Sequence, residues 1–213
     1  MNSFNIKLSY FAAVPFATIA LFLSSASGAL YQTTSESVPS TTIYDINGKL
    51  HAYIGVLLIP NGTYTGSVLN AANLSNADLA GATLTGANLS DVNLSNVDLT
   101  DATLTSTNLN GADLTEVVLT GATLTATKFT DTILTGVITG SLLGAPLELP
   151  AQWNLIHGYL IGPGANLTNA LLATANLAAA NLTGVISGNI TGTPALPPDW
   201  ELLNGYLVGP VLI

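Results

Sequence analysis

Residues 67–136 read SVLNAANLSNADLAGATLTGANLSDVNLSNVDLTDATLTSTNLNGADLTEVVLTGATLTATKFTDTILTG. Every fifth residue is large and apolar, and this spacing fits neither the face of an α-helix nor the alternation of a β-strand. The residue two positions earlier is small or β-branched, most often alanine, and the other three are mostly Asn, Asp, Thr, Ser or Gly. The large apolar positions are Leu69, Leu74, Leu79, Leu84, Leu89, Leu94, Leu99, Leu104, Leu109, Leu114, Leu119, Leu124, Phe129 and Leu134.

This short fixed period predicts an all-β solenoid, in which each coil buries its apolar residues only by stacking on its neighbours. The large residue and the small residue two positions before it are expected to point inward. The other three positions are expected to face solvent. The flanking segments are then expected to be caps, because a bare coil end is an open sheet edge.

The repeats resemble the pentapeptide-repeat family, whose consensus is Ala-(Asp/Asn)-Leu followed by two variable residues. The resemblance covers residues 67–136 and 165–186. It implies a right-handed quadrilateral β-helix with four pentapeptides to a coil, so that residues one coil apart stack on the same side. Some members of the family imitate DNA and bind DNA gyrase, and those proteins are cytoplasmic, dimeric and strongly acidic along one face.

The composition excludes several kinds of site. The chain has 213 residues, of which 48% are apolar and only 7% charged, and its net charge is -9. This balance excludes a basic groove for nucleic acid. The absence of cysteine excludes disulfides and thiolate metal sites.

The first 29 residues have the layout of a secretory signal peptide. Lys7 precedes an apolar run from Phe11 to Leu23, and small residues follow, ending at Ala29. The run is too short for an ordinary membrane span; an uncleaved anchor or a buried helix is the alternative. We therefore expect cleavage near Ala29 and export to the periplasm, the cell surface or the medium. Residues 30–42 are expected to be a flexible lead-in, with membrane contact only through the signal segment.

Residues 43–62 are predicted to form an N-terminal hairpin cap. Two apolar segments flank Asn47-Gly48, a dipeptide typical of tight β-hairpins. Counting back in fives from Leu69 places Tyr64 in the inward position, so the pentapeptide β-helix is expected to cover residues 63–136.

A longer repeat begins where the fives end. Residues 137–163 recur as residues 185–210, with the shared motifs Leu-Pro-x-x-Trp and Gly-Tyr-Leu-x-Gly-Pro. Each copy is predicted to contain a strand, a proline-containing turn and a second strand, with Trp153 and Tyr159 in one copy and Trp200 and Tyr206 in the other.

The two copies are given structural roles. Residues 137–164 are expected to form a plug or rim, 165–186 a second pentapeptide block and 187–213 the C-terminal cap. The alternative is an aromatic platform for a ligand. Similar insertions resemble those of exported bacterial pentapeptide-repeat proteins of unassigned function.

The sequence carries no motif for catalysis, a cofactor or a metal. His51 and His157 have no metal-ligand spacing, and the second module has Asn204 in the place of His157. Asp78 and Asp98 would lie about 4.8 Å apart on adjacent coils. Their repulsion in water is weak, and a weak calcium site is the alternative to two independent carboxylates. The sequence therefore predicts a protein that is not an enzyme.

One outward pair of residues repeats from coil to coil. Two threonines flank the inward residue, which predicts a two-wide array spaced about 6.7 Å along the strand and about 4.8 Å between coils. The array resembles the Thr-x-Thr ladders of β-helical antifreeze proteins, which bind ice; the alternative is that threonine suits an exposed strand. The array comprises Thr63, Thr65, Thr83, Thr85, Thr103, Thr105, Thr123 and Thr125.

These features favour an exported, non-enzymatic β-helical protein with a structural, adhesive or protein-binding role. Its expected partner is an envelope or extracellular protein or polysaccharide, and neither a cofactor nor a nucleic-acid partner is expected. Binding of ice or another crystal surface through the threonine array is the second interpretation. Imitation of DNA toward gyrase is ranked third. This chain has an export signal, scattered acids and interruptions, and in these respects it differs from the gyrase-binding members.

Overall fold

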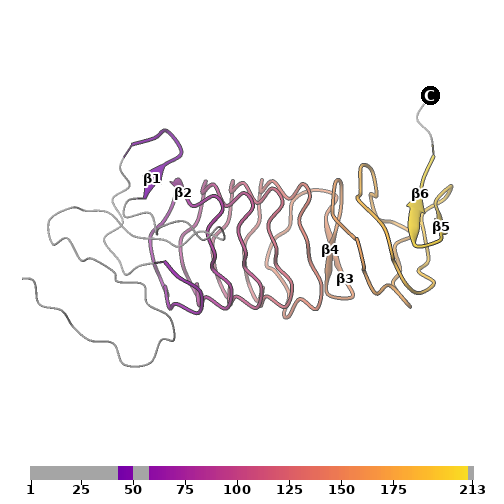
Figure 1. Ribbon diagram of the computed structural model, residues 1–213, viewed down its shortest axis with the longest axis horizontal. Coiled ribbons are helices and arrows are strands. Elements are labelled where there is room, and N and C mark those ends of the chain that lie inside the picture. Colours follow the sequence, from indigo (N-terminus) through magenta and orange to yellow (C-terminus); the bar gives the residue numbers. More distant parts are fainter. Residues whose placement is uncertain (1–42, 50–57, 211–213) are drawn as a thin grey trace, which may run out of the picture.

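The computed structural model describes residues 43–49 and 58–210. These residues form one elongated stack of coils (Figure 1). Strands β1 (Tyr44–Asp45) and β2 (Ala72–Asn73) lie at one end, β3 (Asn154–Ile156) and β4 (Tyr159–Ile161) lie between, and β5 (Glu201–Leu203) and β6 (Tyr206–Val208) lie at the other end. Along the described ranges no helix has the length and hydropathy to cross a bilayer.

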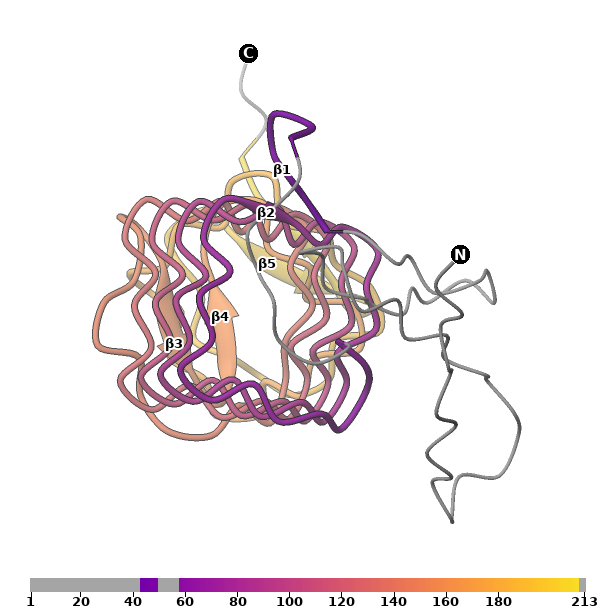
Figure 2. The ribbon, with the colours of Figure 1, turned by 90° about the vertical axis from the view of Figure 1, so that its left-hand side faces the viewer.

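Parallel β-bridges join residues that are twenty apart in the sequence. Each bridge involves the centre of one five-residue repeat, so a coil has four sides, and successive coils superpose as a four-sided ring in the view along the stack (Figure 2). We name the sides by the residues at their centres. Side A is centred on Thr63, Thr83, Thr103 and Thr123; side B on Val68, Asn88, Asn108 and Lys128; side C on Asn73, Asn93, Asp113 and Ile133; side D on Asp78, Asp98, Val118 and Ile138.

A β-turn forms each corner of the first block. The φ angle is positive at every fifth residue, with values of 66° at Gly81, 57° at Asp101 and 74° at Gly121. The next N–H donates to the carbonyl of the preceding inward leucine, as Ala82 does to Leu79 at 3.0 Å. Only glycine adopts this left-handed conformation without steric cost, and Asn and Asp tolerate it better than most residues. The corner therefore explains the Gly, Asn and Asp residues that the sequence analysis treated as merely solvent-facing.

Where the residue just before an inward leucine is Asn or Asp, its side chain also supports the corner. Oδ1 of Asp98 accepts the backbone N–H of Thr100 at 2.8 Å, and Oδ1 of Asn93 accepts that of Ser95 at 3.0 Å. Such Asx turns imitate a backbone turn with the side chain. The same bond is made by Asn73, Asp78, Asn88, Asn108, Asp113, Asn166, Asn176 and Asn181.

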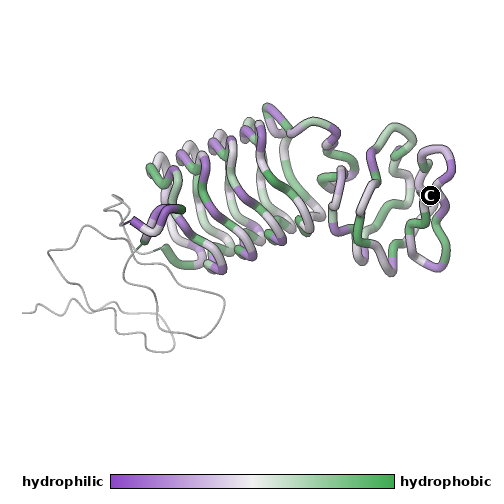
Figure 3. Tube along the Cα trace, turned by 90° about the horizontal axis from the view of Figure 1, so that it is seen from above, coloured by the Kyte–Doolittle hydropathy of each residue, from purple (hydrophilic) through white to green (hydrophobic). Residues whose placement is uncertain are grey.

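The large apolar residues of the repeats fill the interior. From Leu74 to Leu134 all of them are at most 2% exposed, and apolar and polar residues alternate along every coil (Figure 3). Tyr64 takes the same inward position in the first coil. Its hydroxyl donates to the carbonyl of Ile59 at 3.0 Å and accepts the N–H of Ile59, which places the polar end of the ring against backbone.

Threonine replaces alanine at some of the small inward positions. Thr107 and Thr127 are fully buried, and their hydroxyls donate to the carbonyls of Leu84 and Leu104 at 2.7 and 2.6 Å. Among the described residues no buried side-chain nitrogen or oxygen lacks a hydrogen-bond partner. The interior is therefore a packed core of side chains.

The ladder of bridges continues past residue 136, where the fives fail. Ile138, Leu143 and Glu148 bridge to the residues twenty positions earlier. The predicted boundary between the β-helix and the first Trp module is therefore wrong, because residues 137–148 still add to the stack. The bridges still recur every five residues, but the sizes of the inward side chains change. Val137 and Leu142 stand where the earlier repeats have a small residue, and Thr139 stands where they have leucine.

The first module ends in a hairpin that crosses the interior. β3 and β4 pair antiparallel, and His157 and Gly158 form the turn with φ of 51° and 76°, the left-handed pair of a type I′ turn. One face of the hairpin, with Leu155 and Leu160, packs against the core of the first block. The opposite face packs against the core of the second block with Ile156, Tyr159 and Ile161.

The hairpin is a difference from the sequence prediction. A single second strand was expected after the proline-containing turn, but two short strands follow it. The signal for the missed turn is clearest in the second copy, where Asn204-Gly205 stands between Leu202-Leu203 and Tyr206-Leu207-Val208. His157 occupies the equivalent position, so its role is that of a left-handed turn residue.

The second block continues the same stack after the hairpin. Asn166 bridges to Ile138, and then Ile186, Thr191 and Ala195 bridge to residues one coil earlier. The hairpin of β5 and β6 covers the far end of this core with Leu202 and Leu207.

The N-terminal end shows part of the predicted cap. The turn at Asn47-Gly48 is present, since the N–H of Gly48 donates to the carbonyl of Asp45 at 2.9 Å. β1 pairs antiparallel with β2 of the first coil, which the sequence analysis did not predict. The expected partner strand around residues 50–54, His51, the signal segment 1–29 and the lead-in 30–42 lie outside the described residues.

Candidate interaction surface

The threonines at the centre of side A form the most regular outward column. Thr63, Thr83, Thr103 and Thr123 are joined in order by parallel bridges, which spaces them at about 4.8 Å. The column ends at Leu143, whose side chain is largely exposed. Side A is therefore hydroxylated over four coils and apolar beyond them.

The second threonine of each pair lies on a corner. Thr85 stands between inward Leu84 and left-handed Gly86, and the N–H of Ala87 closes the turn onto the carbonyl of Leu84 at 2.9 Å. The predicted spacing of two residues along one flat strand is thus incorrect. The corner threonines Thr65, Thr85, Thr105 and Thr125 form their own column. The N–H of the residue after each of the first three donates to the carbonyl of the threonine on the next coil.

Side B carries amides and then a pair of opposite charges. Nδ2 of Asn108 donates to Oδ1 of Asn88 on the preceding coil at 3.2 Å. Lys128 and Glu148 are neighbours in the same column, and the hydroxyl of Thr130 donates to Oε2 of Glu148. This side is polar, and its chemistry changes from coil to coil.

Asp78 and Asp98 are adjacent on side D, as the twenty-residue coil implies. Oδ1 of each accepts a backbone N–H within its own corner, from Ala80 and Thr100. In the described part of the chain no group of three or more His, Asp or Glu residues could hold a metal ion. The two carboxylates therefore act as turn acceptors, and the structure does not support the calcium alternative.

The acids are distributed around the stack. Glu148 is on side B and Asp113 on side C, while others occupy corners with positive φ. The corner acids are Asp91, Asp101, Glu116 and Asp131. This arrangement does not form one continuous acidic face.

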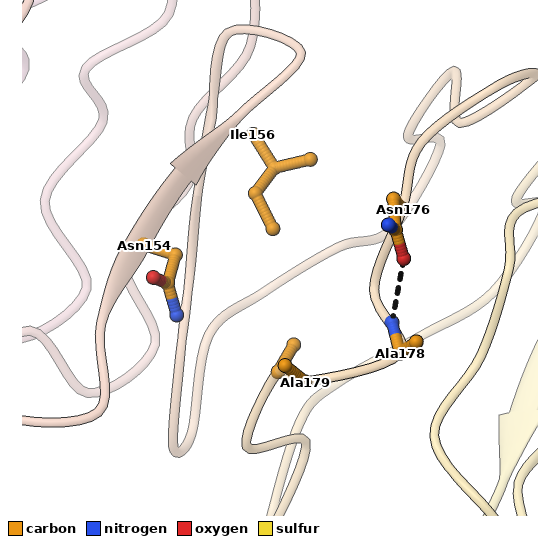
Figure 4. A pocket seen from close by; sticks show the side chains of 6 residues that line it. Asn154, Ile156, Asn176, Ala178 and Ala179 are labelled. Carbon is orange, nitrogen blue, oxygen red and sulfur yellow. Dashed lines mark hydrogen bonds between the residues drawn. The ribbon is translucent and has the colours of Figure 1, made fainter.

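A groove of about 220 Å³ lies where the hairpin meets the second block (Figure 4). Asn154 and Ile156 of β3 form one wall, and Asn176 bonds to the N–H of Ala178 on the other. The remaining lining comes from Ala179 and Ala180. The groove has amide and methyl groups but no titratable side chain in its lining, so it offers shape and hydrogen bonding but no acid–base chemistry.

The aromatic residues of the modules pack on glycine. A Cβ on Gly162 would overlap the ring of Trp153, and one on Gly140 would contact the ring of Tyr159 at 3.2 Å. Trp153 also packs against the cores of both blocks. These rings therefore act in packing, which argues against the alternative of an aromatic ligand platform in the first module.

Comparison with known proteins identifies the repeats. The family described as Pentapeptide repeats matches residues 65–101, 98–136 and 163–186, in 8 copies. No curated protein matches the chain by sequence.

Several solved structures are similar to part of this chain. A pentapeptide repeat protein of the Arabidopsis thaliana thylakoid lumen is 22% identical over 55% of this chain and 69% of its own, with a TM-score of 0.39. HetL of Nostoc sp. strain PCC 7120, involved in heterocyst differentiation regulation, is 24% identical over 73% of this chain and 67% of its own, with a TM-score of 0.21. QnrB1, a plasmid-mediated fluoroquinolone resistance protein, is 17% identical over 60% of this chain and 82% of its own, with a TM-score of 0.22.

Proposed function

Since residues 65–136 and 163–186 of this chain are pentapeptide repeats, we propose that it is an exported, non-enzymatic β-helix with a structural, adhesive or protein-binding role. The observation that carries the proposal is the ladder of parallel bridges from Thr63 to Ala195. It holds the polar side chains of successive coils in fixed columns on the outside of a filled core. Such a scaffold can present a repeating surface to a large partner.

The interior supports an interaction at the outer surface. Leucine side chains and the hairpin of β3 and β4 fill the space inside the coils. A macromolecular partner would therefore contact the sides or corners. Export rests on the signal-peptide layout of residues 1–29, and it would place the partner, a protein or polysaccharide, in the envelope or outside the cell.

A matched set of four variants tests binding through a side. Thr103→Lys, Asn108→Lys, Asp113→Lys and Val118→Lys each place one cation at the centre of a different side of the same coil. All four positions are half-buried. Asn108→Lys and Asp113→Lys also remove an Asx turn, so these two should lose more stability than Thr103→Lys and Val118→Lys. Retention of each variant on the native envelope is then measured beside the unchanged protein.

We expect one substitution, or two on neighbouring sides, to release the protein while the others leave retention unchanged. The thermal unfolding temperature of each variant provides the control for folding. Equal retention of all four folded variants would contradict binding through the sides.

The threonine column on side A favours a second candidate function, which is binding to ice or another crystal surface. Thr63, Thr83, Thr103 and Thr123 are bridged in one straight column. A regular row of hydroxyl and methyl groups can match a repeating lattice, whereas the other sides change chemistry from coil to coil.

Substitution on the same coils separates this candidate from a general surface effect. Thr83→Lys combined with Thr103→Lys should abolish inhibition of ice recrystallisation, because two long cations interrupt the centre of the column. Asn88→Lys combined with Asn108→Lys changes side B of the same coils and should leave the inhibition unchanged. Activity that survives the threonine changes would exclude side A.

A further inference from the structure

The two Trp modules are equivalent in structure as well as in sequence. In the first, the N–H of Leu142 donates to the carbonyl of Gly158, and the N–H of Leu160 donates to Oγ1 of Thr139, both at 3.1 Å. In the second, Ile190 donates to Gly205 at 3.0 Å, and Leu207 donates to Oγ of Ser187 at 3.1 Å. Because both hairpins are anchored in the same way, corresponding side chains should face in corresponding directions.

We call the face of each hairpin that is directed away from the first block its outward face. In the hairpin of β3 and β4 this face is covered by the next coil. Ile161 is fully buried there, and Ile156 and Tyr159 are half-buried against the core of the second block. The hydroxyl of Tyr159 also accepts the N–H of Leu171, at 3.0 Å. This face of the hairpin thus packs against the second pentapeptide block.

The same face of the second hairpin is uncovered within the described residues. Val208, the counterpart of Ile161, is 46% exposed compared with 0% for Ile161. Leu203 and Tyr206 are also about half exposed. Glu201, on the same face by strand alternation, is exposed beside Val208. The far end of the stack therefore presents a flat apolar surface edged by a negative charge.

The opposite end of the stack exposes apolar side chains and a lysine, and the acid there, Asp45, accepts the backbone N–H groups of Asn47 and Lys49 within the turn. Tyr44 of β1 and Ile46 of the turn that follows it are about half exposed. Ile59, which precedes the first coil in the sequence, is partly exposed. Lys49 is exposed on that turn. Figure 1 places β1 and the pair β5–β6 at opposite ends of the long axis.

We propose that copies of this chain associate head to tail, with the turn at residues 44–49 of one copy seated on the outward face of β5 and β6 of the next. The apolar groups on each end would be removed from water, which is the general driving force for association. Lys49 of one copy would approach Glu201 of the other, giving complementary charge at the rim. A head-to-tail contact that does not close into a ring produces a linear filament.

The charges favour this contact over a two-fold one. If two copies met through the same β5–β6 face, each would bring Glu201 and the exposed Asp199 to that contact. Like charges across an interface oppose association. The head-to-tail contact instead brings these acids toward the exposed Lys49, while the carboxylate of Asp45 on the same turn already accepts two backbone N–H groups.

Two end variants and a mixture of them test the proposal with residues 30–213. Ile46→Glu alters one end and Leu203→Glu the other, and both side chains are about half exposed, so both variants should fold. Ile133→Glu, an equally exposed isoleucine on side C, is the matched control. Sedimentation velocity over a range of protein concentrations measures association.

The unchanged protein and Ile133→Glu should form longer species as concentration rises. Each end variant alone should associate at least tenfold more weakly. Their equimolar mixture should stop at a dimer, because one intact contact remains between the free end of Leu203→Glu and the free end of Ile46→Glu. This complementation is specific to a contact between two different ends.

Charge reversal provides an independent readout. Lys49→Glu or Glu201→Lys alone should weaken association, and the double variant should recover it. The proposal is overturned if the unchanged protein stays monomeric at the highest attainable concentration, or if the mixture of end variants remains monomeric. It is also overturned if Leu203→Glu blocks association while Ile46→Glu has no effect, since that result indicates a two-fold contact through β5–β6.

Discussion

At the scale of single residues, the corner of each coil decides which side chains the repeat tolerates. The left-handed position is occupied by Gly66, Gly86, Ser106 and Ala126 on one corner, and all four have φ between 56° and 67°. On another corner a side chain reaches over the glycine of the next coil: a Cβ on Gly121 would overlap Oδ1 of Asp101. Glycine therefore avoids the left-handed strain that Ser106 and Ala126 bear at the first corner, and at the second corner Gly121 also leaves room for the side chain of Asp101.

Alanine at two glycine positions should separate these requirements. Gly86→Ala meets nothing within 4 Å, so it should lower the unfolding free energy only by the left-handed strain, about 1–2 kcal/mol. Gly121→Ala should lower it further, because Asp101 must move. The loss is measured by denaturant unfolding.

Removing the obstructing carboxylate tests the reason given. The comparison is between Asp101→Ala and the double variant Asp101→Ala/Gly121→Ala. The unfolding free energy lost between them should equal the loss caused by Gly86→Ala alone. Equal losses for Gly86→Ala and Gly121→Ala would show that the overlap costs nothing.

At the scale of elements, the hairpin of β3 and β4 joins the two pentapeptide blocks. Its opposite faces belong to different cores, and Trp153 packs against both of them. The equivalent Trp200 packs against the second core alone, because the far face of its hairpin is exposed. The tryptophan of the first copy should therefore contribute more to the free energy of unfolding than the tryptophan of the second.

Truncation of the two tryptophans should reveal that difference. Trp153→Ala should destabilise the protein by about 3–5 kcal/mol, the usual loss for a large aromatic residue in a core. Trp200→Ala should cost less, since its ring has only one core to lose. Thermal unfolding of both variants gives the comparison, and an equal or greater loss for Trp200→Ala contradicts a bridging role for Trp153.

The sequence is sufficient to predict the inward leucines. They occupy the same position in every five-residue repeat, and apolar side chains that repeat in this way can be buried together only inside the coils. It does not reveal that residues 137–148 still belong to the stack. Their bridges are made by backbone groups, which any residue supplies, and the inward positions exchange large and small side chains at Val137 and Thr139.

The threonine array shows another reason for a partial prediction. The column of Thr83 and Thr103 follows from the twenty-residue coil alone. The position of Thr85 does not, because it depends on the left-handed turn at Gly86, which moves the second threonine from the side to the corner. The Gly, Asn and Asp residues at every fifth position were the available signal for that turn.

At the scale of the whole molecule, the described chain is a rod whose sides are mainly polar, with exposed apolar residues such as Val68, Ile133 and Leu171, and whose two ends also expose apolar residues. Its sides hold repeating columns of hydroxyl, amide and carboxylate groups, and its ends expose Tyr44 and Ile46 or Leu203, Tyr206 and Val208. The contact proposed with a foreign partner lies on the sides, and the contact proposed between copies lies at the ends. Both proposed roles depend on where the protein resides, because its location decides which partners it meets.

The most direct test is to fractionate the native host and determine the mass of the protein in each fraction. We expect a chain that begins near residue 30, located in the envelope or the medium, because cleavage near Ala29 follows from the signal-peptide layout of the first residues. Material in the envelope supports a structural or adhesive role, and material in the medium supports a released binding protein. An unprocessed chain that retains residues 1–29 and remains in the cytoplasm would contradict the account.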